Sequence, residues 1–234
     1  MKKLLATVRC DIRIQFRNGF YYATAFVLVF FILVLNQLPG IDWGWLLPLI
    51  ILLNMSFTGF YFIGGIVLLE KGEGTIKVQL ISPLDSGTYL LAKIISLLIL
   101  IIIESLVLVI VLYGFNFRII YYLIGTVLAG IIFILAGFLA VAPYNSLSDY
   151  LLPSVGYSAL ASLPLIIGFA NWDNYLIYLH PLQPALIFLN HSFNIVAGWK
   201  LIYSFIYSLI SITVIYRISK KVFYNIVIDD QEVL

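Results

Sequence analysis

Residues 94–103 read Ile-Ile-Ser-Leu-Leu-Ile-Leu-Ile-Ile-Ile, and this uncharged run decides the fold class. It lies within a longer apolar stretch, Tyr89–Tyr113, and about 20 helical residues are enough to cross the hydrocarbon core of a bilayer. Soluble domains are roughly 25% charged, whereas this chain of 234 residues is 10% charged and 63% hydrophobic, with a mean hydropathy of +1.09. The composition predicts an integral membrane protein, and a net charge of +2 does not indicate nucleic-acid binding.

Six apolar stretches are long enough to span a bilayer. We expect an all-α membrane protein with six transmembrane helices, because lipid cannot satisfy a bare backbone and the alternating pattern of a β-barrel is absent from the sequence. The expected spans are Phe20–Leu38, Trp45–Leu69, Tyr89–Tyr113, Ile119–Val141, Tyr150–Phe169 and Val196–Tyr216. The fifth is the weakest prediction, because Pro153 and Pro164 interrupt it.

The distribution of lysine and arginine predicts the orientation. Of the 13 lysines and arginines, all except Arg118 and Lys200 flank the N-terminus, the connection between spans two and three, or the end of span six. Positive residues favour the cytoplasmic side. We therefore expect a multi-pass protein of a bacterial or archaeal cell membrane, with both termini in the cytoplasm and residues 217–234 as a cytoplasmic tail.

The N-terminal residues 1–18 have the pattern of an amphipathic helix. Apolar residues recur every four positions, and a parallel stripe of arginines follows one position later: Leu4, Val8, Ile12 and Phe16, then Arg9, Arg13 and Arg17. Such a helix lies in the membrane interface with its arginines at the lipid headgroups. The alternative is a basic flank that only sets the topology.

The outer connection, residues 170–194, is too short and too interrupted by proline to span the membrane twice. We expect a partly inserted, re-entrant helical segment there. His180 and His191 lie in it without ligand spacing, so no metal site is predicted. Cys10 is the only cysteine, which excludes an intrachain disulfide.

The cytoplasmic loop, residues 70–88, has the features of a rigid connector. Gly72 and Gly74 allow the chain to turn sharply away from span two, and Thr75 through Ser82 can form about two helical turns that Pro83 ends. A stiff segment between two spans would transmit force to both. Its apolar residues would contact a cytoplasmic partner, and the alternative is an ordinary interfacial loop.

The same segment also follows a recognisable motif: an acidic residue, then Gly-Thr, then Ser-Pro, then a lysine one turn into the third span. The matching residues are Glu70, Gly74-Thr75, Leu80, Ser82-Pro83-Leu84 and Tyr89-Leu90-Leu91-Ala92-Lys93. This pattern resembles the segment after the second span of ABC-2 type transporter permeases. More narrowly, residues 17–23 and 68–75 resemble small permeases known as fluoroquinolone exporters.

The resemblance implies an ABC-2 permease fold of the type V exporter kind, covering nearly the whole chain. It implies that two permeases, identical or sister chains, form a dimer above two ATPase subunits. In that family the helix at Thr75–Ser82 is a coupling helix that receives ATP-driven motion. The coupling residues implied here are Glu70, Glu73, Gly74, Thr75, Ile76, Leu80, Ser82 and Pro83.

Nucleotide chemistry is expected in a separate chain. The sequence contains no G-x-x-x-x-G-K-[ST] motif and no Gly-Lys dipeptide, so it cannot form the loop that cradles phosphates. We expect no catalytic residue and no bound cofactor in this chain, with ATP and Mg held by the partner ATPase.

Polar residues inside the spans are candidates for the substrate pathway or gating. Glu104 lies in the third span, roughly 16 Å along the helix from Lys93. An ionisable residue at such a depth usually faces a cavity or a partner, and the alternative is that it reaches water at the outer leaflet. Asn54 lies in the second span and could form hydrogen bonds between helices.

The function predicted from sequence is the permease subunit of an ABC exporter that moves amphipathic drugs, lipids or similar molecules. An ion-coupled secondary transporter is the first alternative, although that class usually has repeated halves with several intramembrane carboxylates. An intramembrane enzyme would need polar residues clustered at one cavity. A non-transporting membrane assembly protein is the third alternative.

Overall fold

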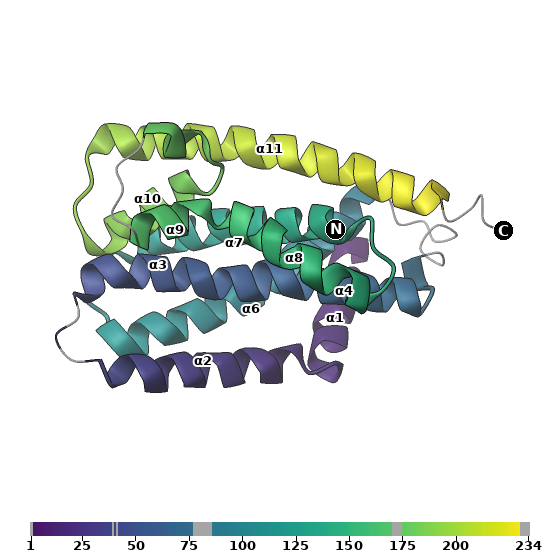
Figure 1. Cartoon of the computed structure of the whole chain (residues 1–234), viewed down its shortest axis with the longest axis horizontal. Coiled ribbons are helices and arrows are strands. Elements are labelled where there is room, and N and C mark those ends of the chain that lie inside the picture. Colours follow the sequence, from purple (N-terminus) through teal and green to yellow (C-terminus); the bar gives the residue numbers. More distant parts are fainter. Residues whose placement is uncertain (1, 39, 41, 77–85, 170–174, 230–234) are drawn as a thin grey trace.

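The structure is a computed structural model that describes residues 2–38, 40, 42–76, 86–169 and 175–229. Within these ranges every regular element is helical, and the helices pack side by side into an elongated bundle (Figure 1). This confirms the prediction of an all-α protein. Leu80, Ser82 and Pro83 of the expected coupling helix lie outside the described residues.

The chain begins with two helices at a sharp angle, α1 (Lys2–Arg17) and α2 (Phe20–Asn36). Their axes are bent by 63°, so α1 lies across the end of the bundle while α2 runs along it (Figure 1). The turn passes through Gly19, whose φ of +84° is in the left-handed region that favours glycine. Helix α2 is two residues shorter than the expected first span.

The second apolar stretch forms one long helical segment, Trp43–Gly72. It consists of α3 (Trp43–Met55), the π-helix η1 (Ser56–Tyr61) and α4 (Phe62–Gly72). The sequence did not suggest the π-helix. The predicted loop at 70–88 is corrected here, because Glu70 still belongs to α4 and α6 has begun by Ser86.

The third and fourth stretches are uninterrupted helices, α6 (Ser86–Tyr113) and α7 (Ile119–Val141), and α7 matches the predicted span residue for residue. The fifth is divided into α8 (Leu147–Ala161) and α9 (Leu163–Phe169). The break precedes Pro164, which has no N–H to donate to the residue four positions earlier and whose ring would clash with that carbonyl in a continuous helix.

The C-terminal part contains η2 (Tyr175–Leu179), α10 (Gln183–Phe193) and α11 (Gly198–Asp229). Helix α10 is mostly buried, and it packs against α7, α11 and α3. Helix α11 continues past Tyr216, so residues 217–229 of the predicted tail are helical, and the cytoplasmic position of that tail stays a prediction.

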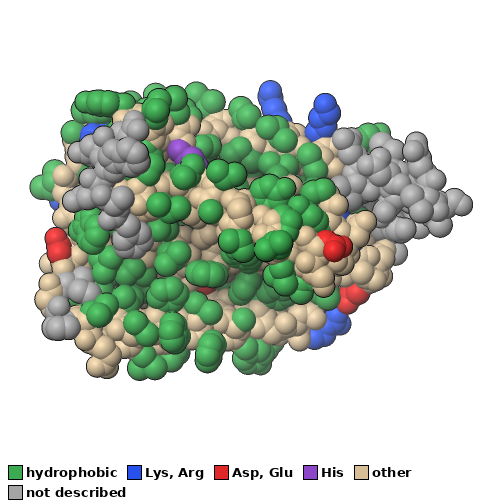
Figure 2. Space-filling model, viewed as in Figure 1, with side chains coloured by type: hydrophobic (Ala, Val, Ile, Leu, Met, Phe, Trp, Pro, Cys, Tyr) green, Lys and Arg blue, Asp and Glu red, His purple; other side chains and the backbone are tan. Residues whose placement is uncertain are grey.

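The outside of the bundle has the character of a lipid-facing surface. Large apolar side chains are exposed along its length, including Leu152 at 83% and Phe26 at 75% (Figure 2). Four described helical segments are long and apolar enough to cross a membrane, and the bent pair α1–α2 would make a fifth. An apolar surface of this extent is unstable in water, which supports a membrane protein.

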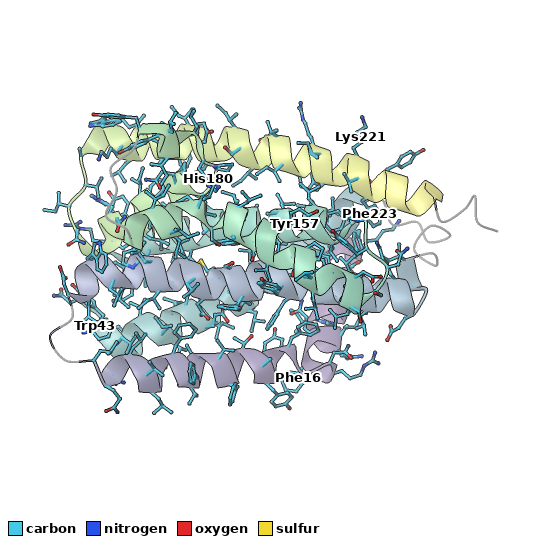
Figure 3. The ribbon with its side chains drawn as sticks, in the orientation of Figure 1. Phe16, Trp43, Tyr157, His180, Lys221 and Phe223 are labelled. Carbon is cyan, nitrogen blue, oxygen red and sulfur yellow. The ribbon has the colours of Figure 1, made fainter. Side chains whose placement is uncertain are left out.

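Different helix ends and connecting segments lie at the two ends of the bundle. Helix α1, the end of α4, the connection between α7 and α8, and the end of α11 lie together (Figure 1). We call this the α1 end. The turns after α2, α6 and α10 lie at the opposite end, where Trp43 is found, whereas Phe16 and Lys221 are at the α1 end (Figure 3).

The centre of the bundle is closely packed where η1 meets α7. Gly137 of α7 lies so near the η1 backbone that an added Cβ would collide with the Phe60 carbonyl oxygen and would lie 2.8 Å from its Cα. Backbone atoms cannot move aside as a flexible side chain can. Only glycine fits at this position.

We predict that Gly137→Ala lowers the free energy of unfolding by about 1–3 kcal/mol through overpacking. Gly156→Ala in α8 is the matched control, because nothing lies within 4 Å of its added Cβ, and alanine there should be neutral or stabilise the helix by about 0.5–1 kcal/mol. Thermal unfolding in detergent micelles measures both variants. Equal melting temperatures would contradict the close packing of η1 on α7.

Candidate functional site: a buried ion-pair network at the α1 end

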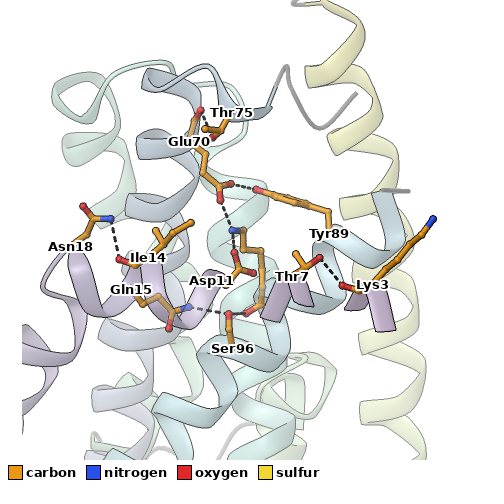
Figure 4. Close-up of polar contacts among 11 residues, drawn as sticks. Lys3, Thr7, Asp11, Ile14, Gln15, Asn18, Glu70, Thr75, Tyr89 and Ser96 are labelled. Carbon is orange, nitrogen blue, oxygen red and sulfur yellow. Dashed lines mark hydrogen bonds and ion pairs between the residues drawn. The ribbon is translucent and has the colours of Figure 1, made fainter. Parts of the chain in front are cut away.

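Three charged side chains from three helices meet inside the α1 end of the bundle. The ammonium of Lys93 in α6 lies 2.6 Å from Asp11 Oδ1 of α1 and also pairs with Glu70 Oε1 of α4 (Figure 4). These residues are 1%, 4% and 4% exposed, respectively. We call Asp11, Glu70 and Lys93 the ion-pair network.

An aromatic residue extends the network to a fourth helix. Tyr89, one turn before Lys93 in α6, donates its hydroxyl to Glu70 Oε2 at 2.6 Å (Figure 4). The Lys93 ammonium lies 5.1 Å from the centroid of the Tyr89 ring. The same ring stacks on Phe223 of α11, with centroids 4.6 Å apart. Both Glu70 oxygens are thus satisfied.

A second polar contact holds α1 against α6. Gln15, one turn after Asp11, donates from Nε2 to Ser96 Oγ at 2.9 Å, and Ser96 donates to the Lys93 carbonyl at 3.1 Å. Gln15 and Ser96 are both buried. The face of α1 that meets the bundle is therefore partly polar.

This finding corrects the predicted faces of α1. Of the expected apolar stripe, Val8 is buried and Phe16 is exposed. Phe16 instead contacts the rings of Tyr21 and Tyr22 at the start of α2. The predicted lipid-facing arginines, Arg9, Arg13 and Arg17, are all exposed on the outer side.

Electrostatics explain why the three charges occur together. Each would lose several kcal/mol of hydration if it were buried alone. Mutual attraction at low dielectric, together with the hydrogen bonds from Tyr89, offsets that loss. The position of α1 is consequently determined by where the Lys93 ammonium lies.

The network adjoins the start of the expected coupling segment. Thr75 donates its hydroxyl to the Glu70 carbonyl at 3.1 Å, across the turn made by Glu73 and Gly74, whose φ is +68°. Ile76 is buried at 3% exposure, whereas Glu73 is exposed. Thr75 and Ile76 are helical, and the coupling role of these residues stays a prediction.

Lys71 holds the same turn from another direction. Its ammonium donates to the carbonyl oxygens of Ala142 at 2.6 Å and Tyr144 at 2.7 Å. Those carbonyls belong to the connection between α7 and α8. The chain that leaves α4 is therefore anchored on both sides before residue 77.

The two candidates for the substrate pathway lie deeper in the bundle. Glu104 is 2% exposed, and its Oε2 accepts a hydrogen bond from Thr58 of η1 at 2.9 Å. The alternative that Glu104 reaches water is therefore wrong for this conformation. Asn54 of α3 is 2% exposed, and its Nδ2 has no hydrogen-bond partner. Their proposed roles remain untested.

The two histidines of the outer segment have structural partners. The Leu182 N–H donates to His180 Nδ1 at 3.2 Å, so Nε2 must carry the proton that faces the Leu160 carbonyl at 3.1 Å. Burial lowers the pKa of His180, which agrees with this neutral form. In the described residues, no group of three metal-ligating side chains could hold an ion.

Sequence reasoning placed Glu70, Tyr89 and Lys93 in one motif, but it did not predict that they pair and it missed Asp11. Asp11 interrupts the periodic pattern of the N-terminal helix, and Lys93 is the only charged residue in its own apolar stretch apart from Glu104. Charges of opposite sign in otherwise apolar helices are costly unless they pair. That rule could have linked Asp11 to Lys93.

The sequence profile of the fluoroquinolones export permease protein family matches residues 2–231. The chain belongs to this family. Two Mycobacterium tuberculosis relatives named fluoroquinolones export permease protein, from strains CDC 1551 / Oshkosh and ATCC 25618 / H37Rv, are each 28% identical to it. The alignments span 237 residues and cover 100% of both chains. The resemblance seen in residues 17–23 and 68–75 is confirmed.

We predict that Lys93→Met destabilises the permease by about 3–5 kcal/mol, because two buried carboxylates lose their counter-charge. Lys220→Met is the matched control, since it removes the same charge from an exposed position of α11 and should change stability by less than about 0.5 kcal/mol.

The triple variant Asp11→Asn, Glu70→Gln, Lys93→Met removes every charge of the network and should recover most of the loss. Thermal unfolding in detergent compares the three proteins. A Lys93→Met protein as stable as the control would show that the network contributes nothing.

Proposed function

We propose that this permease is the membrane subunit of an ATP-binding cassette exporter for amphipathic molecules. The observation that carries the proposal is the buried ion-pair network, which joins α1, α4 and α6 around the start of the segment at 73–85. Family membership and the lipid-facing surface support it. Because the relatives are named for fluoroquinolones, those drugs are the first substrates to test.

The arrangement supports six membrane crossings with both termini on one side. The crossings would be α2, the segment Trp43–Gly72, α6, α7, the pair α8–α9, and α11. The α1 end carries Arg9, Arg13 and Arg17 together with the exposed lysines of α11. Positive charge favours the cytoplasmic side, so we place the α1 end in the cytoplasm, with α1 at the lipid interface.

The mechanism would convert ATP-driven motion into a change of helix packing. A separate ATPase, with its own ATP and Mg, would press on the segment that begins at Thr75. Thr75 is bonded to the end of α4, and Glu70 of α4 is joined through Lys93 to α6 and α1. A push at this point would therefore move the three helices together and open an outward path.

The expected assembly contains two permeases and two ATPase subunits. A second copy or a sister permease would complete the pathway across a dimer interface, and this chain would perform no covalent chemistry. Copurification of the permease with a Walker-type ATPase, followed by ATP-dependent uptake of a fluorescent fluoroquinolone into inverted vesicles, tests the proposal. ATP-independent uptake driven by an ion gradient would overturn it in favour of secondary transport.

We predict that Thr75→Val lowers ATP-driven transport at least several-fold while ATP hydrolysis by the complex continues. Valine keeps the shape of threonine but cannot donate to the Glu70 carbonyl. Thr75→Ser keeps the hydroxyl and is the matched control. The ratio of molecules transported to ATP hydrolysed measures coupling, and an unchanged ratio in Thr75→Val would place the coupling contact elsewhere in the chain.

A further inference from the structure

A second buried carboxyl contrasts with the ion-pair network. Glu104 lies in the middle of α6 at 2% exposure, roughly 16 Å from Lys93 along the helix. Its Oε2 accepts one hydrogen bond from Thr58, and its Oε1 has no partner. Neither ion pair found in the described residues includes it.

Other unsatisfied polar groups surround the same carboxyl. Tyr122 of α7 is fully buried and close enough to Glu104 to feel its charge. Its hydroxyl lies near Ser105 and Thr126 without meeting a partner at hydrogen-bond geometry, and the Thr126 hydroxyl also has none. We call Thr58, Glu104, Tyr122 and Thr126 the Glu104 cluster. Native proteins leave few buried polar atoms unsatisfied.

The chain itself shows what a buried charge requires. Lys93 is compensated by two carboxylates, and Glu70 also receives a hydrogen bond from Tyr89. Glu104 has a single neutral donor, which is too little to hold an ionised carboxylate in an apolar interior. A neutral, protonated carboxyl fits this packing.

The surroundings also contain the element most able to rearrange. Thr58 lies in the π-helix η1, which inserts an extra residue into the helical turn, and such segments often occur at functional sites. The neighbouring Gly59 approaches Phe133 so closely that an added Cβ would lie 2.9 Å from it. Because Thr58 donates to Glu104, a shift of η1 away from α6 would break that hydrogen bond and uncover the carboxyl.

We propose that Glu104 is a proton-exchange site that binds the positive group of an organic cation in the open conformation. The inference rests on the proposed transport function and names the substrate class: amphiphiles that carry an ammonium or similar cation. In the step, the Glu104 O–H bond breaks, the proton passes to water, and the resulting carboxylate pairs with the incoming cation. Charge is conserved, because one positive charge enters the site as another leaves.

The chemistry of the cluster favours an organic cation over a metal ion. Magnesium and calcium require six or more oxygen ligands, whereas the cluster offers one carboxylate and three hydroxyls. An aromatic ring such as that of Tyr122 attracts organic cations through its π face. The experiment below also tests whether sodium or potassium binds in place of the organic cation.

Other titratable groups do not compete for this role. The described elements packed against α6 are α1, α2, α3, η1, α7 and α11. Helix α3 has no titratable side chain, and Asp11 of α1 is bonded to Lys93. The tyrosines with contacts elsewhere are Tyr21 and Tyr22 with Phe16, Tyr61 with Ser158, Tyr121 with His191, Tyr203 with Tyr178, Tyr207 with Leu179, and Tyr216 with Gly87. Tyr122, by contrast, belongs to the Glu104 cluster.

The first measurement needs no partner and no transport. Infrared spectra of the permease in nanodiscs at pH 7 should contain the carbonyl band of a protonated carboxyl, and Glu104→Gln should lack that band. Addition of tetraphenylphosphonium should diminish the band and release one proton per bound cation, read with a pH indicator in weak buffer. Binding of this cation should strengthen as the pH is raised.

Variants and ligands of similar shape but different charge show whether binding depends on the charge of Glu104 and of the ligand. We predict that Glu104→Gln binds tetraphenylphosphonium roughly 10-fold more weakly or worse and releases no proton. Neutral triphenylphosphine oxide should bind both proteins equally and release none. Thr58→Val removes the donor to Glu104, and the protonated-carboxyl band should persist in it.

The outcomes are distinct from those of the transport experiment. Absence of the band in the wild type, its persistence under saturating cation, or equal proton release from Glu104→Gln would each overturn the proposal. Displacement of the proton by sodium or potassium chloride alone would also overturn it in favour of an inorganic cation. The wild-type measurements stand even if a variant does not fold, and a missing ATPase partner would refute only the proposed function.

Discussion

The burial of the Lys93 ammonium is the constraint on which the α1 end of the structure depends. An ammonium that is 1% exposed must be compensated nearby, and neither of its carboxylate partners comes from its own helix. Asp11 is supplied by α1 and Glu70 by α4, 82 and 23 positions away in sequence. Helix α1 must therefore lie across the bundle, because only this placement brings Asp11 to Lys93.

The same constraint gives α1 contacts with the bundle that a helix held only by lipid headgroups would lack. An amphipathic helix held by headgroups alone could slide and rotate in the interface. Asp11 and Gln15 lie one turn apart on α1 and meet α6 at Lys93 and Ser96, so both rotation and register are determined. Movement of α6 must then carry α1 with it, or the buried charges must separate at a cost of several kcal/mol.

The sequence predicted much of the fold because lipid imposes a simple rule on segment length. The span Ile119–Val141 was predicted residue for residue, whereas the re-entrant character of residues 170–194 stays a prediction. The length of a segment, however, gives no information about the contacts between segments. Nothing in the local pattern around Ser56–Tyr61 distinguishes a π-helix from an α-helix, because the extra residue is stabilised by packing against α7.

The candidate site was predicted less completely than the fold, for a related reason. Glu70 and Thr75 stood out through the motif in which they occur, whereas Asp11 was obscured by the regular spacing of the arginines around it. Periodicity assigns a residue to one face of a helix but does not reveal which helix will meet that face. Opposite charges in different apolar segments can indicate which helices meet, because each buried charge needs a partner. The inference is possible in this chain because each apolar segment contains very few charges.

The distribution of polar contacts along the bundle separates rigid regions from the region able to change. At the α1 end the buried Lys93 ammonium is paired, and at the opposite end Arg118 donates to the His191 carbonyl at 2.9 Å while Asn194 donates to the Gly44 carbonyl at 2.8 Å. Between them lie the π-helix and the break between α8 and α9, joined by a long contact of 3.3 Å between Ser56 and Ser162. The unsatisfied groups around Glu104 belong to this middle region. The π-helix and the break between α8 and α9 interrupt the regular helical hydrogen bonding of this region, so it is a place where the packing of the bundle can change.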